Sequence, residues 1–255
     1  MANSITYELP LNERIRTFLR LEKLFKQVVH FSQHDNEWQA RAELGCLLDI
    51  FTLSSRADLK SEITKEIEHH TKSLAFYSNS PNVDSEKLRS SIEKLNELNL
   101  ALHATPGRID QKANQIDLLK CLNQRSSIPG GTCDFDLPGF HYWLNKPLQE
   151  RREEIQYWSE NLIPIQKSVK LLLEYIRSSG MPTPKVAACG VYQQSLGDQQ
   201  AVQLIRVSLD QQSPYFSEIS GGKHRFTVRF MSLRETDRPA QTSDDINFNL
   251  ILCHL

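Results

Sequence analysis

Apolar side chains recur every three or four residues between about residues 12 and 179, which is the period of helices that bury one face. The helix expected from about residue 12 has an apolar face opposite a basic one. Its apolar face consists of Leu11, Ile15, Phe18, Phe25 and Val29. Its basic face consists of Arg16, Arg20 and Lys23. The pattern predicts a helix that packs through one side and presents three cations on the other.

Further helices are predicted along the same region. The second is expected to begin at Asp35, a favourable N-cap residue, and to bury Trp38 together with the leucines that follow. Periodic apolar residues at 59–74 and 88–102 flank a break at 79–84 that contains Pro81, which predicts a helical hairpin. Pro164 should divide the helical stretch 147–179 into two helices or kink it.

Beyond residue 180 the period changes to two, which is typical of strands with one buried face. The alternating apolar residues are Ile205, Val207 and Leu209, then Phe226, Val228 and Phe230, then Ile246, Phe248, Leu250 and Leu252. Gly221 and Gly222 are expected at positive φ in a hairpin turn, and the polar segment 234–245 as a loop. The predicted fold class is α+β, with an all-helical domain at residues 1–180 and a small antiparallel β-sheet domain at residues 181–255.

Composition narrows the class of protein. The 255 residues, 39% hydrophobic and 24% charged, suffice for a packed core. The start of the chain lacks a basic and apolar leader, and no window holds the roughly 18 apolar residues of a membrane span, so a cytoplasmic protein without membrane association is expected. Five scattered cysteines without a Cys-x-x-Cys pair predict reduced thiols. A formal charge of −1 argues against a protein that coats nucleic acid non-specifically, but leaves local basic patches possible.

Motifs for phosphate binding, catalysis or metal binding are weak. The stretch 221–223 resembles part of a phosphate loop, but Ser217 stands where the first glycine belongs and His224 where Ser or Thr would hold magnesium. Asp134 and Asp136 could bind a cation, but turn and capping roles are favoured because no third carboxylate is near in sequence. We therefore predict no cofactor, no metal and no enzymatic activity.

A second basic strip is predicted on the strand after the glycine pair. Lys223, Arg225 and Arg229 alternate with the apolar residues of that strand and should share its outer face. Either basic strip could be an ordinary solvated face, a surface for an acidic protein partner, or part of a nucleic-acid-binding module. The residue pattern alone favours the solvated face, because charged side chains are mostly exposed in any protein.

Three stretches of the chain resemble the ZapD family of bacterial cell-division proteins in order and spacing. They are residues 7–20 (YELPLNERIRTFLR), 127–138 (SIPGGTCDFDLP) and 219–231 (ISGGKHRFTVRFM), and residues 140–144 (FHYWL) extend the second. The resemblance spans the whole chain, although residues 32–104 match only in their helical character.

The resemblance implies a homodimeric, non-enzymatic protein with a helical and a β domain, which acts at midcell. It implies a positively charged surface that binds the C-terminal tail of FtsZ and thereby bundles FtsZ filaments. Matching positions would be Arg16 and Arg20, Arg125 and His141, and Lys223, Arg225 and Arg229. One departure is that Asn114 and Asp117 stand where the family would carry more positive charge.

Overall fold

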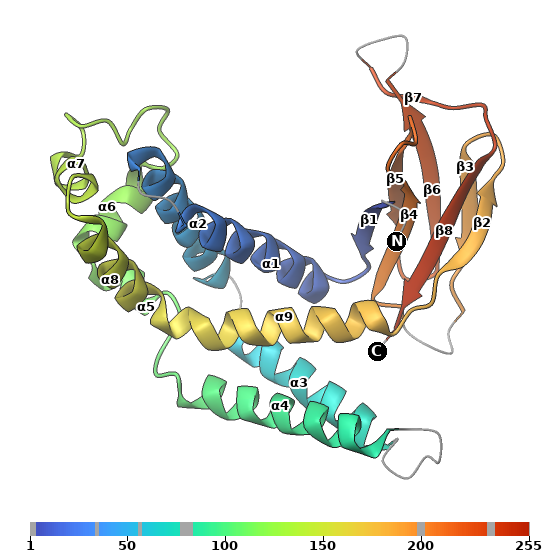
Figure 1. The fold of residues 1–255 in the computed structure, drawn as a ribbon, viewed down its shortest axis with the longest axis horizontal. Coiled ribbons are helices and arrows are strands. Elements are labelled where there is room, and N and C mark those ends of the chain that lie inside the picture. The colour runs from blue at the N-terminus through green and yellow to red at the C-terminus, as the bar shows by residue number, and fades with distance from the viewer. Residues whose placement is uncertain are drawn as a thin grey trace. The chain divides into compact units, whose positions relative to one another are not determined.

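The computed structural model describes residues 4–33, 36–55, 58–76, 84–197, 202–233 and 238–254. It confirms the α+β class, with helices through most of the N-terminal part and antiparallel strands after residue 182 (Figure 1). The chain forms two compact units. One comprises residues 17–172 and is helical; the other combines residues 1–16 with residues 173–255 and contains all the described strands.

Two of the helices, α1 and α9, have residues in both units. The bounds of the helices are α1 Glu13–Phe31, α2 Glu37–Ser55, α3 Leu59–Phe76, α4 Ser85–Ala104, α5 Gln111–Gln115, α6 Asp117–Arg125, α7 Pro138–Leu144, α8 Leu148–Ser159 and α9 Ile163–Ser178. A 3-10 turn, η2 (Glu160–Leu162), joins α8 to α9.

The predicted helix faces are mostly confirmed, with two errors at helix ends. Ile15, Phe18 and Phe25 are buried as expected, but Val29 is 48% exposed near the end of α1. Trp38 is 76% exposed, so the prediction of its burial is wrong. It lies in the first turn of α2, where helical period alone cannot tell whether a neighbouring element reaches far enough to cover the ring. The predicted cap Asp35 lies outside the described residues, and the Asn36 carboxamide oxygen accepts from the Gln39 amide.

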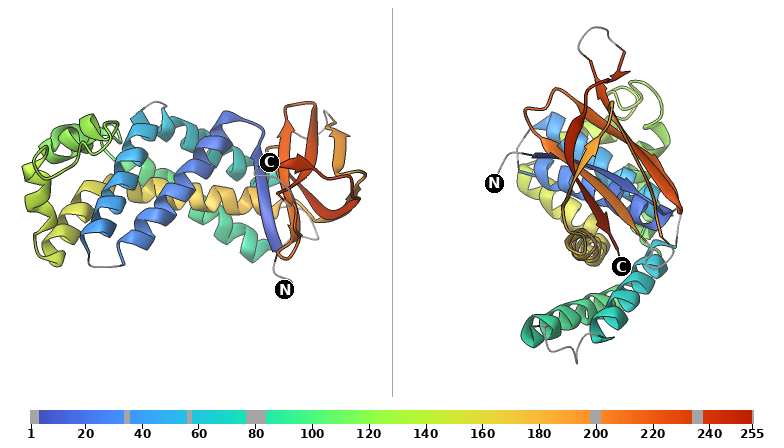
Figure 2. Two further views of the ribbon diagram at one scale, coloured as in Figure 1. Left: turned by 90° about the horizontal axis from the view of Figure 1, so that it is seen from above. Right: turned by 90° about the vertical axis from the view of Figure 1, so that its right-hand side faces the viewer.

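Two predictions were based on prolines, the helical hairpin with a break at Pro81 and the division of the stretch 147–179 at Pro164. α3 and α4 lie side by side as the expected hairpin (Figure 2), and the Asp84 carboxylate caps α4, while most of the predicted break at 79–84 lies outside the described residues. Pro164 lies in α9, just after the 3-10 turn that separates this helix from α8, so the prediction of two helices is confirmed. Its position in the first turn of α9 is favourable because that turn needs no amide donor there.

The strands form two antiparallel sheets. Their bounds are β1 Ser4–Pro10, β2 Thr183–Ala187, β3 Val191–Ser195, β4 Leu204–Asp210, β5 Phe216–Gly221, β6 Arg225–Ser232, β7 Ala240–Gln241 and β8 Ile246–Cys253. One sheet has the order β1-β4-β8-β2; the other has the order β3-β6-β5, with β7 paired to β6. The short β7 lies within the segment 234–245 that was predicted to be a loop.

The inner faces of these sheets pack against each other as a β-sandwich. The predicted alternation is confirmed on β4, β6 and β8, whose inward side chains form one core cluster. The rings of Phe230 on β6 and Phe248 on β8 approach to 5.1 Å between centroids. β1 was not predicted. Its seven residues pair with β4 from Ser4 opposite Asp210 to Pro10 opposite Leu204.

The hairpin of β5 and β6 is confirmed, but the predicted backbone of its glycines is wrong. Among the described glycines only Gly107, Gly130 and Gly190 have positive φ. The Gly222 amide donates to the Arg225 carbonyl at 3.0 Å, so Lys223 and His224 occupy the centre of the turn. Gly221 is required for a different reason, because a Cβ there would lie 2.6 Å from the Cβ of Phe226.

Glu8 on β1 joins two arginines within the sandwich unit. Its carboxylate accepts two hydrogen bonds of 2.9 Å from Arg177 and one of 2.9 Å from Arg206. The carboxylate side chain is only 20% exposed and each arginine side chain 22%. Both cations therefore share one partly buried carboxylate.

Substituting Glu8→Ala should lower the free energy of unfolding by about 2 kcal/mol, because two partly buried guanidinium groups lose a carboxylate that hydrogen-bonds to both. Thermal unfolding followed by far-ultraviolet circular dichroism would measure the loss. Glu13→Ala is the control, since the Glu13 side chain is 74% exposed where it pairs with Arg16. Equal losses in both variants would contradict a special role for Glu8.

Candidate functional site

Arg225 and Arg229 lie together on the outer face of the β3-β6-β5 sheet. Both are exposed on β6, where Phe226, Val228 and Phe230 point into the core. Four residues of extended strand place the two arginines about 13 Å apart along β6. Lys223 is exposed in the adjoining turn rather than on the strand, which corrects the expected three-residue alternation. We call Lys223, Arg225 and Arg229 the cationic face.

The side chains of the cationic face make no hydrogen bond or ion pair with any residue that the structure describes. Glu218 lies directly across from Arg229 in the β5–β6 register, and Thr227 lies between the two arginines on the same face. The cations are therefore available to an external acceptor, with one carboxylate beside them that reduces the local positive charge.

Arg16 and Arg20 lie one turn apart on α1, as expected from their spacing. The Arg16 Nε is 3.0 Å from the Glu13 carboxylate, and its side chain is 43% exposed. Arg20 is exposed, as is Lys23. The basic side of α1 is thus present as predicted, although Glu13 neutralises its first cation.

Residues 126–137, which we call the signature loop, fold as successive turns between α6 and α7. Amide donors at Ile128, Gly131 and Cys133 each reach the carbonyl three residues earlier. Gly130 has φ +70, and a Cβ on Gly131 would lie 2.8 Å from the Cβ of Ile128. Both glycines are therefore required by the backbone of this loop.

Arg125 and His141 flank the signature loop, and each contacts one of its aspartates. Arg125 donates to the Asp136 carboxylate at 2.8 Å, and the His141 Nδ1 is 3.1 Å from the Asp134 carboxylate. Arg41 on α2 also reaches Asp134, at 3.4 Å. The two aspartates thus hold the loop, in agreement with the turn role favoured above, and a partner's carboxylate would have to compete with them.

Clusters of three or more potential metal ligands do not occur among the described residues. Within the same part of the chain, no helix is long and apolar enough to cross a membrane.

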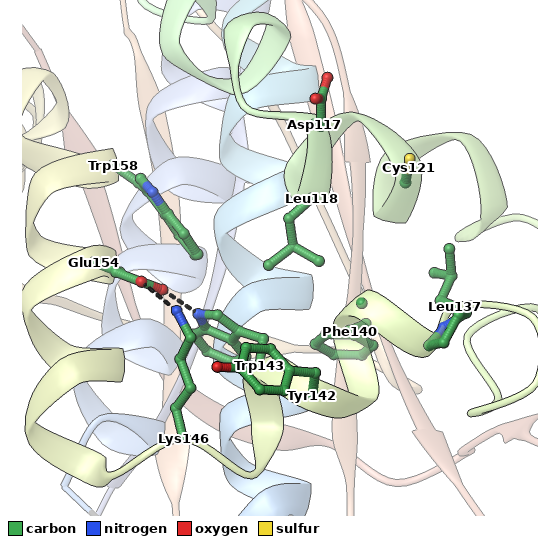
Figure 3. Close-up of a pocket in the computed structure, with 12 residues that line it drawn as sticks. Asp117, Leu118, Cys121, Leu137, Phe140, Tyr142, Trp143, Lys146, Glu154 and Trp158 are labelled. Carbon is green, nitrogen blue, oxygen red and sulfur yellow. Dashed lines mark hydrogen bonds and ion pairs between the residues drawn. The ribbon is translucent and has the colours of Figure 1, made fainter.

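A cavity of about 490 Å³ lies between α6, α7 and α8. The residue pattern did not predict this cavity, because its walls come from three helices and a pattern shows only one element at a time. The one available sign was the aromatic run 140–144, two of whose rings, Phe140 and Trp143, are buried at its wall. Figure 3 shows the side chains of Leu118 and Trp158 pointing toward the space that Phe140 and Trp143 border.

A family model described as "ZapD: Cell division protein" matches residues 19–229, most of the chain. The chain belongs to the ZapD family. It is 40% identical over 255 residues to "Cell division protein ZapD" of Methylococcus capsulatus, with all of both chains covered. It is 35% identical over 251 residues to the protein of that name in Azoarcus sp., and 36% identical over 251 residues to that of Nitrosomonas eutropha. Each of these alignments covers 98% of this chain and 100% of the relative.

Membership of the ZapD family confirms the resemblance and gives the protein a role in cell division. The cationic face lies at the end of the matched region, since the family model extends to Arg229. The signature loop and the walls of the cavity also lie inside it.

Proposed function

We propose that this ZapD-family protein binds the C-terminal tail of FtsZ and cross-links FtsZ filaments without catalysing a reaction or using a cofactor. The cationic face carries the proposal, because it offers exposed cations with no partner among the described residues. The protein would act in the cytoplasm and be recruited to the division site at midcell.

The tail would lie along β6 as an extended segment whose carboxylates pair with the cationic face. Arg225 and Arg229 can each make two parallel hydrogen bonds to one carboxylate, and Lys223 adds a point charge. Arg16 and Arg20 are proposed as further contacts. Arg125 and His141 would contribute least, since Asp136 and Asp134 already occupy them.

Affinity at a single site should be low and sensitive to salt. Exposed ion pairs contribute only about 0–1 kcal/mol each, and salt screens them. Two sites on a homodimer would bind two filament-borne tails at once, and this valency converts weak contacts into a stable cross-link.

If the protein is a homodimer, sedimentation equilibrium should give a mass near twice the 29.4 kDa of one chain.

Co-sedimentation with GTP-assembled FtsZ of the same organism tests the proposal. Full-length FtsZ should carry this protein into the pellet and form bundles, whereas FtsZ without its C-terminal tail should do neither. Absence of pelleting with both polymers would overturn the proposal. Retention on DNA with a steep dependence on salt would then favour the nucleic-acid alternative.

A further inference from the structure

The cavity between α6, α7 and α8 is formed almost entirely by carbon atoms. Its apolar wall consists of Leu118, Leu137, Phe140, Tyr142, Trp143 and Trp158. The volume of about 490 Å³ lies within the range of pockets that bind small ligands. Tyr142 is 70% exposed, so an aromatic side chain also stands at its rim.

The walls of the cavity are fixed before any ligand arrives. The Trp143 Nε1 donates to Glu154 at 2.6 Å, and Lys146 donates to the other oxygen of that carboxylate at 2.6 Å (Figure 3). The Trp143 ring also lies 6.1 Å from the Phe140 ring and 5.7 Å from the Trp158 ring, between centroids. Ordering of these side chains should therefore cost little free energy when a ligand binds.

The charges at the cavity indicate what should flank an apolar ligand group. Asp117 and Glu154 supply two carboxylates against the single cation Lys146. Lys146 and Glu154 already neutralise each other, which leaves Asp117 as the unbalanced charge. Figure 3 shows the Asp117 carboxylate directed away from Leu118, so it belongs to the rim. An apolar group with a basic neighbour fits this arrangement.

We propose that the cavity receives an apolar side chain of the FtsZ tail, with a basic residue of the tail beside it at Asp117. This inference rests on the proposed function. It supplies what the cationic face lacks, because a few exposed ion pairs give little affinity and a buried apolar side chain usually dominates such an interface.

Cys121 provides a direct readout, because it lines the cavity and is exposed. A synthetic peptide with the C-terminal tail sequence of FtsZ from the same organism should protect Cys121 from iodoacetamide. Mass spectrometry should show alkylation of Cys121 slowed about tenfold when the peptide is bound to nine-tenths of the protein, since only the free fraction reacts. Cys133 is the internal control, exposed but outside the cavity wall, and should react at its usual rate.

A filled cavity should exclude the peptide side chain. Cys121→Trp is expected to weaken peptide binding about tenfold or more, the effect of losing one buried apolar side chain. Cys133→Trp is the matched control and should bind as the unmodified protein does. Circular dichroism of both variants checks that the helices remain.

Three results would overturn the inference. If the peptide binds but leaves Cys121 reactive, and Cys121→Trp binds normally, the cavity is not a subsite while the proposed function stands. If the peptide does not bind the unmodified protein at all, both fail. If Cys121 becomes protected without peptide as the protein concentration rises, a second copy of this chain fills the cavity instead.

Discussion

Reversing both charges in Arg225→Glu/Arg229→Glu should weaken binding of the FtsZ tail on the order of 100-fold, because two attractive contacts become repulsive. Both side chains are exposed and point away from the sandwich core, so the fold should not change. Fluorescence anisotropy of a labelled tail peptide would measure the affinity. The far-ultraviolet circular dichroism and the melting temperature should match those of the unmodified protein.

Two further variants separate a specific surface from general electrostatics. Arg89→Glu on α4 changes the charge of an exposed arginine far from β6 in sequence, and should leave binding nearly unchanged. Glu218→Lys removes the carboxylate opposite Arg229 and should strengthen binding while making it more sensitive to salt. Normal binding by the double variant would remove the cationic face from the site.

The residue pattern predicted the outer face of β6 because strand geometry is local. Alternation with a period of two assigns Arg225 and Arg229 to one side and Phe226 and Val228 to the other, whatever else the chain does. Lys223 was misplaced because the exact end of the hairpin turn depends on which residues pair. The Gly222 to Arg225 hydrogen bond, rather than composition, decides it.

Features that depend on distant pairing were missed. β1 pairs with β4 across about two hundred residues of sequence. Ile5, Tyr7 and Leu9 do alternate along it, but seven residues do not show which distant strand they join. The ion pairs of Glu8 were missed for the same reason, because its two arginines come from the distant elements α9 and β4. The sandwich was likewise expected as a single sheet, because alternation shows which face is buried and not what covers it.

The sequence also did not predict which residues the charged side chains would pair with. Arg125 and His141 were selected as cations from the family resemblance alone. In the structure they pair with Asp136 and Asp134 of the signature loop. The tight turns at Gly130 and Gly131 bring these aspartates back toward α6 and α7, and no simple spacing rule predicts such a return. Their proposed contribution to tail binding is correspondingly reduced.

The stability of the helical unit should depend on pH through Glu43. This side chain is 7% exposed on α2, and burial raises its pKa from 4.5 to about 7, against the attraction of Arg152 and Arg151. The folded protein therefore retains a proton that the unfolded chain releases. The free energy of unfolding should fall as the pH rises from about 4.5 through about 7, by on the order of 3 kcal/mol in total.

Glu43→Gln should remove this dependence, because a carboxamide does not titrate in this range. All three tryptophans, Trp38, Trp143 and Trp158, lie in the helical unit, so urea unfolding followed by tryptophan fluorescence reports on that unit. Between pH 5 and pH 8 the unmodified protein should lose stability relative to Glu43→Gln, as should the control Asp49→Asn, which changes an exposed carboxylate of the same helix.

His70 gives the opposite trend at lower pH, and the comparison between variants cancels it. Burial lowers the pKa of His70 from 6.5 to about 4, so its contribution to stability is lost as the pH falls below 6.5. Because His70 is present in every variant, the difference between Glu43→Gln and the unmodified protein isolates Glu43. Parallel curves from pH 5 to pH 8 would show that Glu43 is already ionised in the folded protein, held so by Arg151 and Arg152.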